Sequence, residues 1–231
     1  MTRPKVEKAI LFELGKKCEG IYSVPTKADE KNSGLTGRFY TFSRIINDST
    51  VNISLRFFGK NGLQLEPYLS VSNKQVDDFL VNNGFQPKQM RKPNVVDFNI
   101  ESFLSGTLGG AIYLQHGNSL ESIDTARRAN SIFNRYFDFV QNKCVSKMDS
   151  VFNLELLLND PAQFREGSSL DYRYLWPLQA KIIMGISLAM ICKRPDYEEV
   201  VDAYTTMIKT KFKPGEHEYI DFCIALLDIK Y

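Results

Sequence analysis

The chain has 231 residues, of which 43% are hydrophobic and 24% are charged, values that are ordinary for a folded protein. Subtracting 27 acidic from 29 basic side chains leaves a net charge of +2. This balance excludes a strongly cationic nucleic-acid coat and a polyacidic mimic. The length fits one large domain or two small ones.

Nothing in the sequence indicates export or membrane insertion. Residues 1–17 have charges on both sides of a short apolar stretch and no small-residue cleavage site, so they do not resemble a signal peptide. The most apolar run, residues 178–192, contains Gln179 and Lys181 and is too short to cross a bilayer. We expect a cytoplasmic protein with no membrane partner. Its single, scattered cysteines are then free and mostly buried thiols: Cys18, Cys144, Cys192 and Cys223.

The first elements expected are a helix and a loop. Residues 5–17 have the spacing of an amphipathic helix. Its apolar side is formed by Val6, Ala9, Ile10, Phe12 and Leu14. Residues 23–37 are polar and rich in turn formers, which predicts a loop.

The clearest local pattern is a β-hairpin. Odd-numbered residues are apolar and even-numbered residues mostly polar over 51–57 and again over 63–71, on either side of a Gly-containing turn. A three-residue turn over 60–62 pairs Phe57 with Leu65 and Ile53 with Leu69, which keeps both apolar rows on one face. Residues 38–46 form a third strand before the hairpin. Its facing is ambiguous because Arg44 shares a side with Tyr40 and Phe42.

A short helix follows the hairpin. Residues 72–75 match a capping box, and Val76, Phe79 and Leu80 form a helical face that ends at Gly84. Residues 96–100 and 111–115 are candidates for two further strands. Beyond residue 117 the apolar spacing becomes helical and stays so: helices are expected over 123–144, 151–158 and 177–192, then after Pro195 and after Pro214. The helix ending at Cys192 is apolar on nearly every side, which predicts a central position in a bundle.

These elements predict an α+β fold: an N-terminal helix and an antiparallel meander of three to five strands, followed by a C-terminal helical bundle. We expect an α+β region over 1–117 and a helical region over 118–231, packed as one compact unit.

No catalytic, metal or cofactor motif is complete. His116 and His217 are the only histidines; the first is read as a loop residue and the second as a solvated position at a helix start. No His/Cys cluster has metal-ligand spacing. The glycine-rich stretch over Gly106–Gly110 has no P-loop Lys-Ser/Thr pair, so it is interpreted as a turn. We therefore expect no enzyme activity and no cofactor.

Two basic clusters are interpreted as solvated surface, because neither is interleaved with the exposed aromatics that bind single-stranded nucleic acid. They are Lys88, Arg91 and Lys92, and Lys209, Lys211 and Lys213. Aromatic residues outside the expected core are better candidates for a binding surface, because rigid rings bury area at small entropic cost. The candidate partner-binding residues are Tyr172, Arg173, Tyr174, Trp176, Tyr68 and Arg44. The stretch 168–176 is equally consistent with a loop packed against the bundle.

Residues 37–57 (GRFYTFSRIINDSTVNISLRF) and 65–73 (LEPYLSVSN) carry a resemblance to a protein family. An aromatic first strand that contains Arg, a polar hairpin and a strand with a Pro-Tyr pair resemble small bacterial immunity proteins of contact-dependent and other polymorphic toxin systems. The resemblance is confined to the N-terminal region. It implies a cytoplasmic protein that binds a cognate toxin domain as a heterodimer and blocks it without a cofactor.

The expected function is therefore neutralisation of a toxin by direct protein–protein occlusion. The alternative is a nucleotide- or phosphate-binding enzyme or sensor that uses the Gly106–Gly110 turn with Arg44 and His116. A nucleic-acid-binding function is a third, less favoured hypothesis.

Overall fold

The computed structural model describes residues 3–30, 37–59, 64–86, 93–105, 112–113, 131, 134–160 and 178–230. The strands are β1 (Thr26–Glu30), β2 (Gly37–Ile46), β3 (Ser49–Phe58), β4 (Gln64–Asn73), β5 (Val96–Asn99) and β6 (Ile112–Tyr113). The helices are α1 (Arg3–Cys18), α2 (Lys74–Asn82), α3 (Ile100–Ser105), the π-helical turn η1 (Val140–Cys144), α5 (Val145–Met148), α6 (Val151–Asn159), α7 (Leu178–Cys192), α8 (Tyr197–Lys211) and α9 (Glu218–Leu227). Residues 134–139 are also helical and lead into η1. The predicted α+β class is confirmed.

The strands form one antiparallel sheet in the order β1-β2-β3-β4-β5, and β6 pairs with the start of β4. Strand β1 corrects the prediction of a loop over residues 23–37. Its residues TKADE have no apolar alternation, but each pairs with β2, from Thr26 opposite Thr41 to Glu30 opposite Gly37. Backbone pairing with a neighbour stabilises this strand, and that contribution is invisible in its side chains.

The predicted face of the hairpin is confirmed. Odd-numbered positions of β3 and β4 are buried and even-numbered positions are half-exposed. The turn over 60–62 lies outside the described residues, so the exact pairing of Phe57 with Leu65 remains a prediction. The structure also shows which side of β2 faces the core. Phe42 is buried, and the ring of Tyr40 packs edge-on against that of Phe57, with the ring centroids 5.8 Å apart, so the even-numbered side faces inward.

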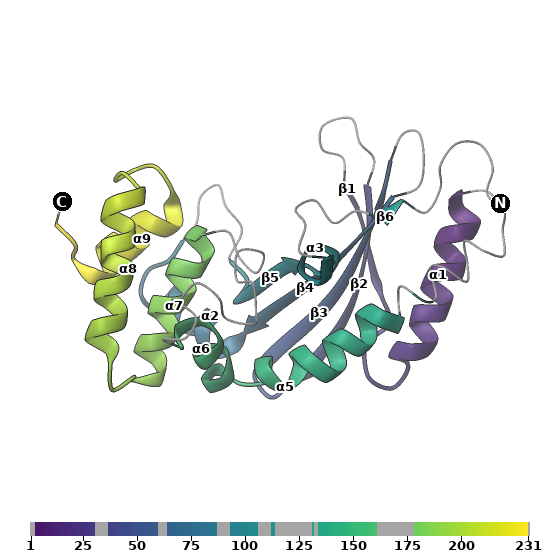
Figure 1. Cartoon of the computed structure of the whole chain (residues 1–231), viewed down its shortest axis with the longest axis horizontal. Helices are drawn as coiled ribbons and strands as arrows, with labels where there is room; N and C mark the ends of the chain where they lie inside the picture. The colour runs from purple at the N-terminus through teal and green to yellow at the C-terminus, as the bar shows by residue number, and fades with distance from the viewer. Residues whose placement is uncertain are drawn as a thin grey trace. The chain divides into compact units, whose positions relative to one another are not determined.

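The chain divides into two compact units, each of which draws on both sides of residue 117. The first contains residues 1–45, 50–70 and 98–146; the second contains residues 46–49, 71–97 and 147–231. In the first unit, α1 and the helical segment 134–146 lie on the same side of the strands (Figure 1). Arg38 of β2 forms an ion pair with the buried Glu7 of α1 at 2.9 Å, which joins the strand to that helix.

The second unit is a helical bundle built around α7. Every residue from Ile182 to Ala189 is buried, and α7 contacts α2, α6, α8 and α9. The predicted central position of this helix is therefore confirmed. The boundaries of its neighbours follow local chemistry: Ser150 caps α6 through the amide of Asn153, and Gly84, at φ +82°, follows the end of α2.

All four cysteines are free thiols, and three of them are buried, as predicted. Among the described residues, no helix has both the length and the hydropathy that a bilayer crossing needs.

Candidate binding surface

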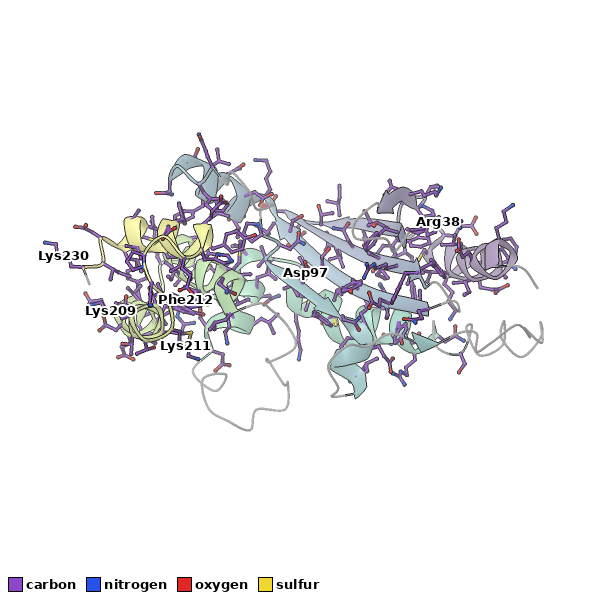
Figure 2. All side chains as sticks on the ribbon, turned by 90° about the horizontal axis from the view of Figure 1, so that it is seen from above. Arg38, Asp97, Lys209, Lys211, Phe212 and Lys230 are labelled. Carbon is purple, nitrogen blue, oxygen red and sulfur yellow. The ribbon has the colours of Figure 1, made fainter. Side chains whose placement is uncertain are left out.

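One face of the sheet in the first unit is polar and half-exposed. Two hydrogen bonds show which residues of β2 belong to this face, because they join odd-numbered residues of β2 to the half-exposed even-numbered residues of β3. Thr41 pairs with Ser54 at 2.9 Å, and Ser43 donates to Asn52 at 2.7 Å. We name this surface the open face; its residues are Phe39, Thr41, Ser43, Ile45, Asn52, Ser54, Arg56, Phe58, Glu66, Tyr68 and Ser70. Figure 2 views the strands from above, and no described helix crosses β2, β3 and β4 in that view.

Arg56 is the centre of a side-chain cluster at one end of the open face. Its Nη1 donates to Glu66 Oε2 at 3.0 Å, and its guanidinium lies 4.9 Å from the ring centroid of Phe58 and 5.6 Å from that of Phe39. The arginine therefore pairs with the Glu66 carboxylate and lies against the rings of Phe39 and Phe58. Such stacking and pairing fix a side chain that would otherwise be mobile.

Tyr68 completes this cluster. Its hydroxyl donates to the same oxygen, Glu66 Oε2, at 2.8 Å. Partial burial raises the pKa of Tyr68 to about 12, and the hydrogen bond to the negatively charged Glu66 adds to the effect. The phenol therefore stays protonated and remains a hydrogen-bond donor at neutral pH.

Arg44, the second candidate in the described part of the chain, lies on the opposite face of the sheet. Its Nη1 donates to Gln141 Oε1 at 3.0 Å, and Gln141 Nε2 donates to the hydroxyl of Tyr22. Gln141 belongs to the π-helical turn η1, and such turns change the direction of a side chain within a helix. Arg44 thus links β2 to the π-helical turn η1 by a hydrogen bond. It does not lie on the same face of the sheet as Tyr68.

The second unit contains a buried polar network. Tyr204 donates to Asn159 Oδ1 at 2.8 Å, and Asn159 Nδ2 donates to the carbonyl of Gly185 at 2.8 Å and to Glu155 Oε1 at 3.1 Å. Arg194 donates to that same Glu155 oxygen at 2.8 Å. Two further bonds, both 2.7 Å long, join Arg194 to Asp196.

This network is directed inward. Glu155, Asn159 and Tyr204 are each 2% exposed or less. Burial raises the pKa of Tyr204, so its hydroxyl remains a donor. A partner in solution does not reach these groups, and their mutual hydrogen bonds account for their presence. We therefore interpret the network as a device that fixes how α6, α7 and α8 pack.

Several predicted site residues lie outside the described residues: Tyr172, Arg173, Tyr174, Trp176, His116 and the Gly106–Gly110 turn. His217 is described: it is half-exposed and lies at a helix start, where the sequence placed it. It is the N-cap of α9: its Nδ1 accepts a hydrogen bond from the amide of Tyr219 at 3.3 Å, and the two rings lie edge to face.

Sequence reasoning missed Arg56, Glu66, Phe39 and Phe58 as site residues. The alternation placed two of them, Arg56 and Glu66, on the polar face, so part of the signal existed. What alternation alone does not give is the lateral position of neighbouring strands, on which their contacts depend.

Within the described ranges, no group of three or more His, Cys, Asp or Glu side chains has the arrangement of a metal site. The structure thus presents one outward-facing polar and aromatic surface in the first unit and one inward-facing network in the second. Comparison of the chain with protein-family models, curated proteins and solved structures finds no match.

Proposed function

We propose that this protein is a non-enzymatic binding protein of the bacterial cytoplasm that neutralises a cognate toxin domain by covering its surface. The observation that carries the proposal is the open face, a row of hydroxyl, amide and aromatic side chains on a sheet that no described helix covers. The resemblance of residues 37–57 and 65–73 to immunity proteins supports the same function. In this proposal the chain acts by shape and hydrogen bonding, without chemistry.

The polar groups of the open face suit rigid docking. Thr41 is bonded to Ser54 and Ser43 to Asn52, so these side chains are ordered before any partner arrives. Binding then costs little side-chain entropy, which is one of the main terms opposing association. Hydroxyl and amide groups also keep spare hydrogen-bonding capacity toward a partner's backbone or side chains.

The Arg56 cluster supplies the aromatic and cationic part of the surface. Arginine, tyrosine and other aromatic residues are enriched at the centres of protein interfaces. Here Phe39 and Phe58 flank Arg56, and Glu66 balances its charge. A partner placed on this cluster gains contact area without burying an unpaired charge, which would be costly.

Exposed apolar side chains border the polar rows. Ile45 is 76% exposed and belongs to the open-face row of β2. Val24 is 85% exposed, and its neighbour Ser23 donates its amide to the carbonyl of Ser43 at 2.7 Å, so it lies beside the same strand. Burying such a side chain contributes about 1.5–3 kcal/mol. These two residues are suited to anchor a partner of ordinary interface size, about 1,600 Å² in total.

The test is a binding assay with the product of a neighbouring gene. The purified chain is mixed with a candidate toxin domain encoded next to it, and size-exclusion chromatography and growth of toxin-expressing cells are measured. We expect a stable heterodimer and restored growth. Absence of both complex and protection for every neighbouring product would contradict the proposal.

Two matched variants locate the surface. Ile45→Arg places a charged side chain on the open face, whereas Val81→Arg makes the same kind of change on α2, where Val81 is 59% exposed. We expect Ile45→Arg to weaken the complex at least about tenfold and Val81→Arg to leave it unchanged. Equal affinity of the two variants would show that the toxin binds elsewhere on the chain.

A further inference from the structure

Glu66 of β4 joins two residues of the open face through a single oxygen atom. Its Oε2 accepts one hydrogen bond from Arg56 Nη1, at 3.0 Å, and another from the hydroxyl of Tyr68, at 2.8 Å. Because Arg56 lies on β3 and Tyr68 on β4, the carboxylate links side chains of two strands. Both bonds are made to an ionised acceptor, which makes them stronger than bonds between neutral groups.

These contacts order the side chains of the group before a partner arrives. The side chain of Arg56 is 24% exposed and that of Glu66 is 15% exposed, so both are largely removed from water. Without the carboxylate, a long arginine side chain and a phenol would sample more orientations. Ordering them during association would then cost free energy, which Glu66 avoids by ordering them in advance.

Glu66 also sets the charge of the open face. Among the residues that define this face, Arg56 and Glu66 are the two that carry a charge, and they are paired with each other. The face therefore has no net charge. A charged patch of a partner would be buried against neutral groups, which is costly. The face therefore fits a partner surface that is polar, aromatic or aliphatic and has no net charge.

The first unit contains a second group of the same chemistry. Glu101 Oε2 accepts hydrogen bonds from Arg135 Nη2, at 2.8 Å, and from the hydroxyl of Tyr136. The side chain of Glu101 is 21% exposed, close to the value for Glu66. Tyr136 is buried, and its helical segment 134–146 lies on the side of the sheet opposite the open face. The Glu101 group thus has the same partners as the Glu66 group and no part in the open face.

We propose that Glu66 is a positioning residue of the open face: it holds Arg56 and Tyr68 in their binding orientation and leaves the face without net charge, so that the face takes an uncharged surface of the partner. This inference rests on the proposed function, because it concerns how the open face recognises the toxin domain. Glu66 acts through Arg56 and Tyr68, which make the contacts.

The test compares Glu66→Gln with the matched control Glu101→Gln, each in the whole chain. Both substitutions remove one negative charge and keep an amide oxygen where an arginine and a tyrosine donate. Calorimetric titration with the neighbouring-gene toxin domain gives the dissociation constants at low and high salt. Urea unfolding gives the loss of stability in each variant, and phenolate absorbance in the absence of a partner reports the ionisation of tyrosine.

We expect Glu66→Gln to weaken the complex at least about tenfold, because the partner must then cover an arginine that has lost its carboxylate. Glu101→Gln should stay within about twofold of the unchanged chain, although it should lower the stability at least as much, since Tyr136 is buried. For the unchanged chain, the dissociation constant should change less than about threefold between about 0.05 M and about 0.5 M salt, because no charged contact is screened.

The measurement without a partner tests the contact itself. The negative charge of Glu66 and its hydrogen bond both raise the pKa of Tyr68, so this residue should ionise at a lower pH in Glu66→Gln. The same substitution in a Tyr68→Phe background should leave the phenolate titration unchanged. An unshifted Tyr68 would show that Glu66 does not hold that residue.

The outcomes separate this inference from the proposed function. Equal affinity of Glu66→Gln and the unchanged chain, an equal loss in Glu101→Gln, or a steep dependence on salt would each overturn the inference and leave the proposed function standing. If no neighbouring product binds the unchanged chain, the proposed function itself fails and the inference falls with it.

Discussion

The ring of Tyr204 occupies the space into which a side chain at Gly185 would project. A Cβ atom added to Gly185 would lie well within 3.0 Å of the Tyr204 hydroxyl, a separation that real Cβ atoms do not show. Helices α7 and α8 therefore approach each other closely at this point, with the tyrosine lying directly on the glycine backbone. The same hydroxyl donates to Asn159, which in turn donates to the carbonyl of Gly185, so the tyrosine is held at the glycine by hydrogen bonds as well.

The first prediction concerns this contact. Gly185→Ala should destabilise the protein by about 1–3 kcal/mol, because forcing an extra methyl group into a filled core displaces the tyrosine. This loss outweighs the gain of up to about 1 kcal/mol that alanine normally gives over glycine in a helix. Gly15→Ala in α1 is the control, because nothing lies within 4 Å of the position that its new methyl group would take, and stability should rise slightly. Urea unfolding of both variants gives the comparison, and a neutral Gly185→Ala would contradict the close approach.

A second prediction addresses the buried network. Tyr204→Phe removes the donor to Asn159 Oδ1 and leaves that buried oxygen unsatisfied, which should cost about 1–3 kcal/mol. Tyr197→Phe, on the same helix but half-exposed, should change the free energy of unfolding by less than about 0.5 kcal/mol. In a double-mutant cycle, Tyr204→Phe and Asn159→Leu should couple by at least about 0.5 kcal/mol. Simple additivity in that cycle would argue against a working bond between the two side chains.

The third prediction separates two possible caps of α2. The sequence pattern suggests Ser72, but the structure places the cap at Asn73, whose side chain accepts hydrogen bonds from the amides of Gln75 and Val76. Asn73 also donates to the buried Ser49 at 3.0 Å. Asn73→Ala should therefore cost about 1–2 kcal/mol, whereas Ser72→Ala should cost little. Thermal melts of the two variants decide between the caps; a larger loss for Ser72→Ala would favour the sequence pattern.

The fourth prediction concerns alkaline pH. Burial raises the pKa of Tyr22 to about 12, as it does that of Tyr68, while a phenol in an unfolded chain ionises near 10. The folded state therefore binds these protons more tightly. Their contribution to stability is complete below pH 10 and is lost as the pH rises toward 12.

The free energy of unfolding should accordingly fall between pH 10 and 12, and it should fall less steeply in Tyr68→Phe, which has one raised phenol fewer. Denaturant titrations at several alkaline pH values, together with phenolate absorbance, measure both effects. An unchanged slope in the variant would mean that Tyr68 ionises in the folded protein as it does in the unfolded chain.

Periodicity predicted those parts of the fold in which burial decides the structure. The alternation around Ile53 and Leu69 correctly gave the buried face of the hairpin, and the apolar run around Ile186 gave the central helix. In both cases each residue's position in the pattern determines whether it contacts water, so the sequence alone carries the information.

Features that depend on a neighbour were not predictable in this way. Strand β1 forms because it pairs with β2, and the residues that follow Thr26 have no apolar alternation that would indicate a strand. Likewise, Arg56 is separated along the chain from Phe39 and Glu66, and only the lateral alignment of three strands brings them together. The burial of Glu7 is a further case, because its partner Arg38 belongs to a different element.

The absence of a polar side on the middle of α7 has a consequence for synthesis of the chain. Two of the helices that cover it, α8 and α9, follow it in sequence and leave the ribosome later. Until they emerge, the apolar surface from Ile182 to Ala189 has no cover from them, and it is a site for chaperone capture or self-association. A released chain truncated after Cys192, which lacks α8 and α9, should therefore be far more prone to aggregate than the whole chain.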